Sequence, residues 1–183
     1  MESTPNSNLK MMIYSSLFTA LTIVGAYISI PTGIVPVVLS TFFIYLGGLL
    51  LGKKWAIIST GLYLLLGLLG LPVFSGGNGG FHHIYGPTGG YLIGYVLAAF
   101  VIGIISENRN KIYIDFIALI AGSFIIHLLG ILWLKFQFPS GWEKTFVIYW
   151  VFIIGDSIKI IVAVSLAKII RPLIFPTSKK TEN

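Results

Sequence analysis

The sequence predicts an all-α integral membrane protein with six transmembrane helices, and three observations support this fold class. Hydrophobic residues make up 56% of the chain and charged residues only 10%, whereas soluble domains carry about 25% charged residues. The apolar residues fall into long, nearly uninterrupted segments. The basic residues gather on alternate sides of these segments, as positively charged loops do at the cytoplasmic face of a membrane.

Six segments approach the roughly 20 apolar residues that a membrane-spanning helix needs. They are residues 9–30, 34–51, 54–70, 89–106, 112–135 and 144–171. Pro31 and Pro36 suit the entrance of the second helix, and we expect Gly52 and Gly70 to end the second and third helices. The whole chain, residues 1–183, is expected to form one transmembrane domain.

The two polar tails, residues 1–8 and 173–183, are expected to be flexible. The first of them lacks the short apolar core of a cleaved signal peptide. The chain contains no cysteine, which excludes a disulfide framework and a thiolate metal site.

The distribution of basic residues predicts the orientation. With six spans, nine basic residues fall on one side: Lys10, Lys53, Lys54, Arg109, Lys111, Lys168, Arg171, Lys179 and Lys180. Only Lys135 and Lys144 fall on the other side. Both termini are therefore expected in the cytoplasm, in a multi-pass protein of the bacterial plasma membrane. The net charge of +6 reflects this asymmetry rather than nucleic-acid binding.

Asp156 and Lys159 lie near the middle of the sixth segment, where topology does not explain a charge. A charge at the bilayer centre costs at least about 2.5–3.5 kcal/mol. The i, i+3 spacing puts the two side chains on one helix face, and the Lys159 ammonium should lean back to the level of Gly155 and Asp156. The pair is either a structural ion pair or a polar binding site, in which Lys159 holds an anion and Asp156 accepts an N–H.

The segment 71–90, LPVFSGGNGGFHHIYGPTGG, holds seven glycines and no formal charge. It is expected on the outer face. Glycine allows close backbone approach, so Gly76, Gly77, Gly79 and Gly80 can fold over a ligand. Asn78 offers a donor and an acceptor suited to an amide or urea group. Apolar walls are expected from Phe74, Phe81, Tyr85 and Tyr91. The alternative is a loosely ordered external loop.

Other chemistries have weaker support in the sequence. The glycine-rich segment lacks the lysine and Ser/Thr of a phosphate-binding loop. Because His82 and His83 are adjacent and have no third ligand at a matching spacing, we expect no metal site. His127 is expected to be a hydrogen-bonded interior residue or a pocket edge. The sequence shows no nucleophile–base arrangement, so enzymatic activity is not expected.

The first segment carries a pair of small residues, Ser16 and Ala20, at i, i+4. Such faces let helices approach closely in lipid. They serve either packing within the bundle or contact with a partner subunit.

Taken together, GLPVFSGGNGG, then GPTGGYLIGY, then Asp-x-x-Lys on the last helix resemble the BioY family over nearly the whole chain. These proteins are the biotin-specific substrate-binding (S) components of energy-coupling factor (ECF) transporters. The resemblance implies a six-helix S-component fold and high-affinity biotin capture at the outer face. It also implies partners, namely a transmembrane coupling (T) subunit and two ABC ATPases. No cofactor is expected, because ATP is used only by the partner subunits.

The resemblance also implies roles for individual residues. Asn78 and Asp156 would contact the ureido ring of biotin, and Lys159 its valerate carboxylate. The lid and wall would comprise Gly76, Gly77, Gly79, Gly80, Tyr85, Gly89, Gly90 and Tyr91. Ser16 and Ala20 would dock on the coupling subunit. The alternatives are an S component for another vitamin, such as thiamine, and a membrane scaffold whose Asp156–Lys159 pair is purely structural.

Overall fold

The computed structural model describes residues 5–31, 35–107, 111–137 and 142–174, and it describes the side chains in these ranges except those of residues 5, 6 and 142–151. Its elements are α1 (Pro5–Tyr27), β1 (Ser29–Ile30), β2 (Val37–Val38), α2 (Ser40–Leu68), the 3₁₀ turn η1 (Ser75–Gly77), α3 (His82–Tyr85), α4 (Gly89–Ser106), α5 (Ile112–Gln137) and α6 (Trp142–Ile174). By length and composition, α1, α2, α4 and α5 could each cross a membrane.

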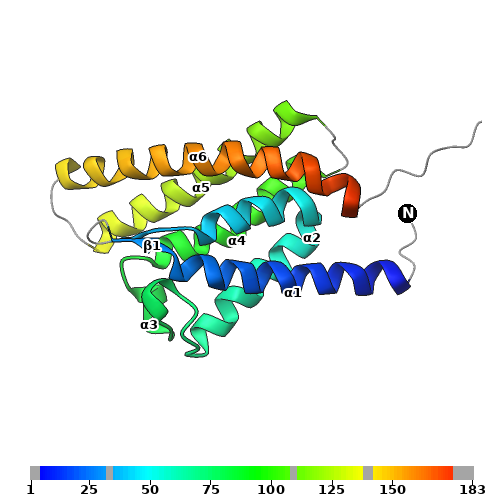
Figure 1. The fold of residues 1–183 in the computed structure, drawn as a ribbon. Helices are drawn as coiled ribbons and strands as arrows, with labels where there is room; N and C mark the ends of the chain where they lie inside the picture. Colours follow the sequence, from blue (N-terminus) through cyan, green and yellow to red (C-terminus); the bar gives the residue numbers. More distant parts are fainter. Residues whose placement is uncertain (1–4, 32–34, 108–110, 138–141, 175–183) are drawn as a thin grey trace, which may run out of the picture.

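Helix α2 is two helices joined at a reversal of the chain. Gly52 has φ 72° and ψ 171°, outside the helical region, and Figure 1 shows the chain turning back on itself within α2. Residues 40–51 and 53–68 are therefore separate arms, which correspond to the second and third predicted spans. Gly70 also has a positive φ, of 97°. The prediction that Gly52 and Gly70 end helices is confirmed.

The predicted start of the second span was wrong. We expected helix from residue 34, but β1 and β2 form a short antiparallel ribbon that pairs Ser29 with Val38 and Ile30 with Val37. The helix begins only at Ser40. Extended backbone is favoured here because Pro36 biases the preceding residue away from helix and because β-branched valines favour strands.

The predicted tails fall partly outside the described residues, namely 1–4 and 175–183. The remainder differs from the expectation, since α1 already begins at Pro5 and α6 continues to Ile174. Arg109, Lys179 and Lys180, which were used to predict the orientation, also lie outside the described residues.

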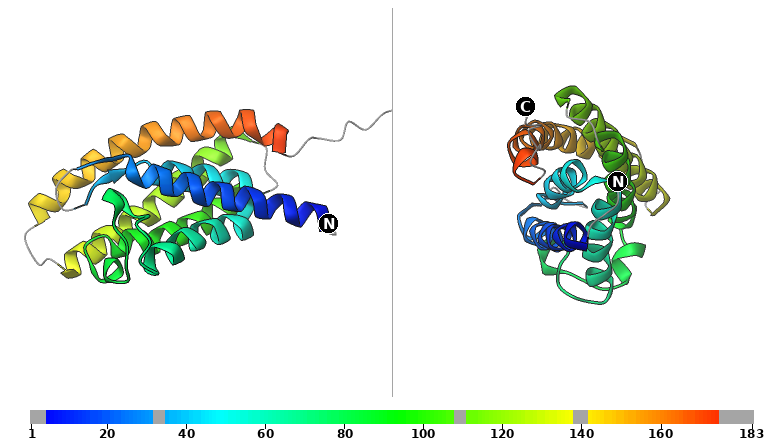
Figure 2. Two further views of the ribbon diagram at one scale, coloured as in Figure 1. Left: turned by 60° about the horizontal axis from the view of Figure 1, so that its bottom comes forward. Right: turned by 90° about the vertical axis from the view of Figure 1, so that its right-hand side faces the viewer.

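The helices form one bundle, in which residues 40–51 lie between α1 and α6 (Figures 1 and 2). Helix α1 runs parallel to residues 53–68. Two hydrogen bonds show this pairing, from Ser15 Oγ to Trp55 O (3.2 Å) and from Thr19 Oγ1 to Ser59 O (3.0 Å). The start of α1 and the end of α6 lie at the same end of the bundle (Figure 1), where Lys10 Nζ donates to Ile174 O (2.8 Å). The β ribbon and α3 lie at the opposite end.

A largely buried ion pair crosslinks the bundle at the end where α6 finishes. Arg171 of α6 makes two hydrogen bonds to the Asp115 carboxylate of α5, at 2.9 and 3.0 Å. Arg171 also donates to Leu49 O, at 3.2 Å. Three helical segments are thereby held together at the end opposite the glycine-rich loop.

Candidate functional site

A cavity of about 320 Å³ lies between the helices and the loop that connects α2 to α4. This volume is in the range of small-molecule binding sites, about 300–1,000 Å³. Five of the residues predicted from the sequence line it: Phe74, Asn78, Tyr91, Asp156 and Lys159. Further lining residues come from α2, the loop, α4, α5 and α6, and include Thr41, Tyr63, His82, His83, Tyr95, His127 and Phe152.

The predicted ion pair lies at this cavity. Lys159 Nζ is 3.0 Å from Asp156 Oδ1, and the two side chains are 10% and 4% exposed. Lys159 also donates to Thr41 Oγ1 at 2.8 Å, and Thr41 Oγ1 donates to Val38 O at 3.1 Å. The prediction that the two charges share one helix face is confirmed. Together they offer a ligand an acceptor beside a donor.

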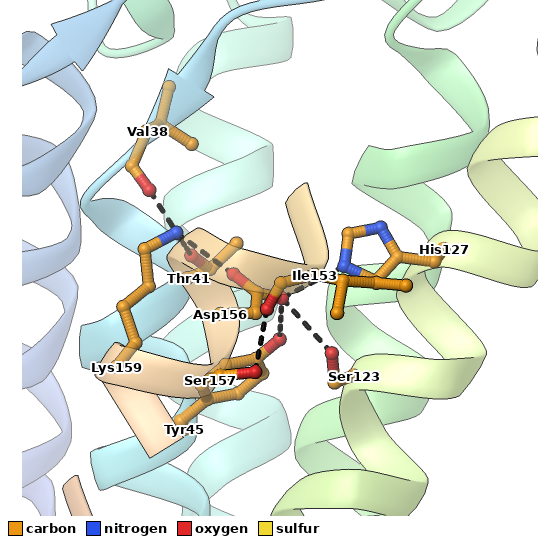
Figure 3. Close-up of polar contacts among 9 residues, drawn as sticks. All are labelled: Val38, Thr41, Tyr45, Ser123, His127, Ile153, Asp156, Ser157 and Lys159. Atoms are coloured by element: carbon orange, nitrogen blue, oxygen red, sulfur yellow. Dashed lines mark hydrogen bonds and ion pairs between the residues drawn. The ribbon is translucent and has the colours of Figure 1, made fainter. Parts of the chain in front are cut away.

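Three further side chains converge on Asp156, and sequence reasoning gave them no role toward it. Tyr45 Oη donates to Oδ2 at 2.6 Å and Ser123 Oγ at 3.0 Å, and His127 Nε2 lies 2.9 Å from the same oxygen. Figure 3 shows them arriving from two different helices. The only signal in the sequence was the i, i+4 spacing of Ser123 and His127, which places both on one face of α5. The expectation that His127 is a hydrogen-bonded pocket-edge residue is confirmed.

Aromatic rings form much of the remaining wall. Tyr91 stacks on Phe152 with ring centroids 5.8 Å apart. Phe74 makes edge contacts with Tyr63 at 5.6 Å and with His83 at 5.4 Å. Such walls suit a flat or bicyclic apolar group. Burial and the neighbouring His82 hold the pKa of His83 below its usual value, so this ring is mostly neutral at pH 7.

The loop over the cavity is tied to two helices. Tyr27 at the end of α1 donates to Pro72 O. At the end of α5, Trp133 Nε1 donates to Gly86 O (3.0 Å), and Gln137 donates to Tyr85 O. Within the loop, the Asn78 amide closes a turn by donating to Ser75 O at 2.8 Å. These bonds define an ordered shape for the segment.

Seven of the residues predicted for the lid do not line the cavity. They are Gly76, Gly77, Gly79, Gly80, Tyr85, Gly89 and Gly90. Tyr85 is 64% exposed and packs against Phe81. A Cβ on Gly89 would stand 1.8 Å from Ile84 O, and one on Gly90 would stand 2.3 Å from Trp133 Cβ. Gly89 thus permits close packing of α4 on α3, and Gly90 permits close packing of α4 on α5.

The part of the chain that the structure describes contains no cluster of three His, Asp or Glu side chains able to hold a metal ion. Gly155, at whose level the Lys159 ammonium was expected, does not line the cavity; a Cβ there would be 3.6 Å from Val37 Cγ1.

Comparison with known proteins matches residues 1–175 to the model of the BioY family. The chain belongs to the BioY family. It is 41% identical to the biotin transporter BioY of Thermotoga maritima over 159 residues, covering 87% of this chain and 94% of that protein. It is 36% identical to the biotin transporter BioY of Lactococcus lactis over 177 residues, covering 92% and 94%.

A solved structure has the same fold. The crystal structure of the S-component for biotin from an ECF-type ABC transporter superposes with a TM-score of 0.86. It is 35% identical, and the match covers 93% of this chain and 95% of that one. The predicted six-helix S-component fold is confirmed, and the chain is a multi-pass membrane protein.

The two small residues that were predicted to form a packing or partner-contact face in this BioY family member lie on α1. Ser16 and Ala20 are both exposed and lie one helical turn apart. They are available either to lipid or to a partner subunit.

Proposed function

We propose that this protein captures biotin from outside the membrane as the substrate-specific S component of an ECF-type transporter. One observation carries the proposal. In a chain of the BioY family, an ion pair at the cavity sets the Asp156 carboxylate and the Lys159 ammonium side by side in an aromatic pocket. Relatives named as biotin transporters, 32–42% identical, support the choice of vitamin.

The spacing of the pair favours one orientation of biotin. A ureido group carries N–H donors next to a carbonyl acceptor, and it is complementary to Asp156 Oδ1 and Lys159 Nζ only 3.0 Å apart. The valerate carboxylate is separated from that ring by a chain of methylene groups, so it cannot reach the same place in an extended ligand. A carboxylate there would also face the Asp156 charge. We therefore place the ureido ring at the pair and the carboxylate toward the loop. This revises the expectation that Lys159 holds the carboxylate.

The loop residues complete the proposed site. Asn78 would exchange its hydrogen bond to Ser75 O for one to the ligand. Phe74 and Tyr91 would cover the apolar bicycle. The glycines at 76, 77, 79, 80, 89 and 90 would act through the backbone shape of the lid, and Tyr85 would act at its outer surface.

The proposed partners follow from the neighbour's description as an S-component of an ECF-type ABC transporter. They are a transmembrane coupling subunit and two ABC ATPases, which alone would use ATP. Ser16 and Ala20 would contact the coupling subunit. The chain itself is not an enzyme, since its relatives are transporters and transporter components.

Titration of the purified protein with biotin tests the proposal. We expect saturable binding below micromolar concentration, and thiamine, the alternative vitamin, should fail to compete. Tighter binding of another vitamin would replace biotin in the proposal.

A thermal-shift screen separates transport from a purely structural role. A ligand at 100 times its Kd stabilises the folded state by about 2.7 kcal/mol, so biotin should raise the unfolding temperature clearly. If Asp156→Asn damages folding and no small solute raises the unfolding temperature of the unmodified protein, the ion pair belongs to a scaffold.

A further inference from the structure

The oxygen Asp156 Oδ2 is surrounded by three donors. Tyr45 Oη lies at 2.6 Å, His127 Nε2 at 2.9 Å and Ser123 Oγ at 3.0 Å. In contrast, among the described side chains only that of Lys159 lies within hydrogen-bond distance of Oδ1, through its Nζ atom. A carboxylate has about four lone-pair positions in all. The contacts therefore saturate Oδ2 and leave one acceptor position on Oδ1.

Two of the three donors stand outside the cavity. Tyr45 is 0% exposed and Ser123 is 9% exposed, and neither lines the cavity, whereas Asp156 and Lys159 do. Figure 3 shows the Tyr45 and Ser123 side chains reaching Asp156 from the side opposite Val38. A ligand in the cavity thus meets the carboxylate but not these two hydroxyl groups. Whatever they contribute to binding must pass through Asp156.

The terminal torsion of an aspartate side chain is broad, so a carboxylate held by one partner alone can rotate. Here donors from α2 and α5 hold a carboxylate carried by α6. A fixed acceptor binds more tightly than a mobile one, because less freedom is lost on binding.

We infer that Tyr45, Ser123 and His127 are positioning residues, which lock Asp156 so that Oδ1 presents one acceptor position to a single N–H group of the ligand. This inference rests on the proposed function, since it needs a ligand with an N–H donor at Asp156. It assigns a binding role to two hydroxyl groups that the ligand never touches.

The test uses Tyr45→Phe and Ser123→Ala, each of which removes one oxygen, and measures biotin affinity of the full chain in detergent by calorimetry. We expect each change to weaken binding about three- to tenfold. The matched control is Ser106→Ala, since Ser106 is also buried but donates to Gly48 O at 3.4 Å away from the cavity. It should bind biotin as the unmodified protein does.

A double-mutant cycle separates positioning from general packing. In an Asp156→Ala background, Tyr45→Phe should cause no further loss of affinity, because the acceptor through which it acts is gone. An undiminished loss in that background, or unchanged affinity in both single variants, overturns the inference.

A defect in folding must be distinguished from a defect in binding. If a variant is isolated only as aggregate, biotin added at saturating concentration during extraction should restore the folded protein, because a weakened site still binds at high concentration. Failure of that rescue means that the hydroxyl groups support the fold as a whole, and it overturns the inference. Absence of biotin binding by the unmodified protein overturns the proposed function instead.

Discussion

Lys159 Nζ lies 3.0 Å from Asp156 Oδ1, and both side chains are nearly inaccessible to solvent. Because Lys159 also donates to Thr41 Oγ1, two of its three N–H donors are already used within the protein. Among the contacts of the residues that the structure describes, one donor of Lys159 and one adjacent acceptor position of Asp156 remain for a ligand. This is the hydrogen-bonding pattern of one side of a urea, and it underlies the orientation proposed for biotin.

The first prediction concerns Lys159→Ala. Loss of a hydrogen bond from a charged donor costs about 1.5–3 kcal/mol, so biotin affinity should fall roughly 10- to 150-fold. With the ureido ring at the pair, a carboxyl-blocked analogue such as biotin amide should lose affinity by a similar factor. Calorimetry with both ligands gives the two ratios directly.

The control for this comparison is the unmodified protein with the same two ligands. A much larger loss for biotin than for its amide shows that Lys159 holds the carboxylate, as the sequence alone suggested. It would leave biotin capture intact and reverse the orientation of the ligand.

A second prediction concerns the ion pair at the other end of the bundle. Asp115 and Arg171 are 3% and 14% exposed, and breaking a buried pair costs about 3–5 kcal/mol. Arg171→Ala should therefore lower the unfolding temperature strongly. Biotin affinity of the folded fraction should not change, because neither residue lines the cavity.

The surface pair Lys53–Glu107 is the matched control, with 3.3 Å between the charges and side chains 53% and 38% exposed. Exposed pairs contribute about 0–1 kcal/mol, so Lys53→Ala should scarcely affect stability. Both variants are measured by thermal unfolding in the same detergent. Equal effects of the two substitutions would contradict the view that burial makes the Asp115–Arg171 pair the more stabilising one.

The fold could be predicted from the sequence where local signals sufficed. The apolar segments, and Gly52 and Gly70 as helix ends, are short-range features. The contact between Asp156 and Lys159 follows from i, i+3 geometry within one helix. The β ribbon was missed because two-residue strands are too short to show the alternation by which strands are recognised.

The partners of Asp156 could not be predicted because they depend on tertiary packing. Tyr45 is 111 residues away in the sequence and Ser123 is 33 residues away. The ion pair between Asp115 and Arg171 could not be predicted for the same reason, since the two residues are 56 positions apart in the sequence. The sequence analysis gave Asp115 no role and used Arg171 only to predict the orientation. A single sequence shows which groups are polar but not which helix faces they share.

A third prediction concerns the proposed docking face of α1. Ala20 is exposed and is proposed to contact the coupling subunit, so a large side chain there should block assembly. Ala20→Trp should bind biotin normally but should not co-purify with the coupling subunit or support uptake. Ile120→Trp, at a position of α5 that is 58% exposed, is the control for a bulky change facing lipid. Normal uptake by Ala20→Trp removes Ala20 from the interface.

The last prediction concerns how α2 supports the cavity wall. A Cβ on Gly67 would stand 2.1 Å from Phe74 Cζ, whereas a Cβ on Gly61, in the same arm, has nothing within 4 Å. Gly67→Ala must displace the Phe74 ring, which is buried and lines the cavity. Overpacking of this kind costs about 1–3 kcal/mol, so both stability and biotin affinity should fall.

Gly61→Ala separates this contact from the general effect of alanine in a helix. Alanine is the better helix former by roughly 1 kcal/mol, so this variant should be as stable as the unmodified protein or slightly more stable, with unchanged biotin affinity. If Gly67→Ala behaves in the same way in thermal unfolding and titration, then Phe74 can move without cost. In that case the close approach of loop and helix does not determine the shape of the site.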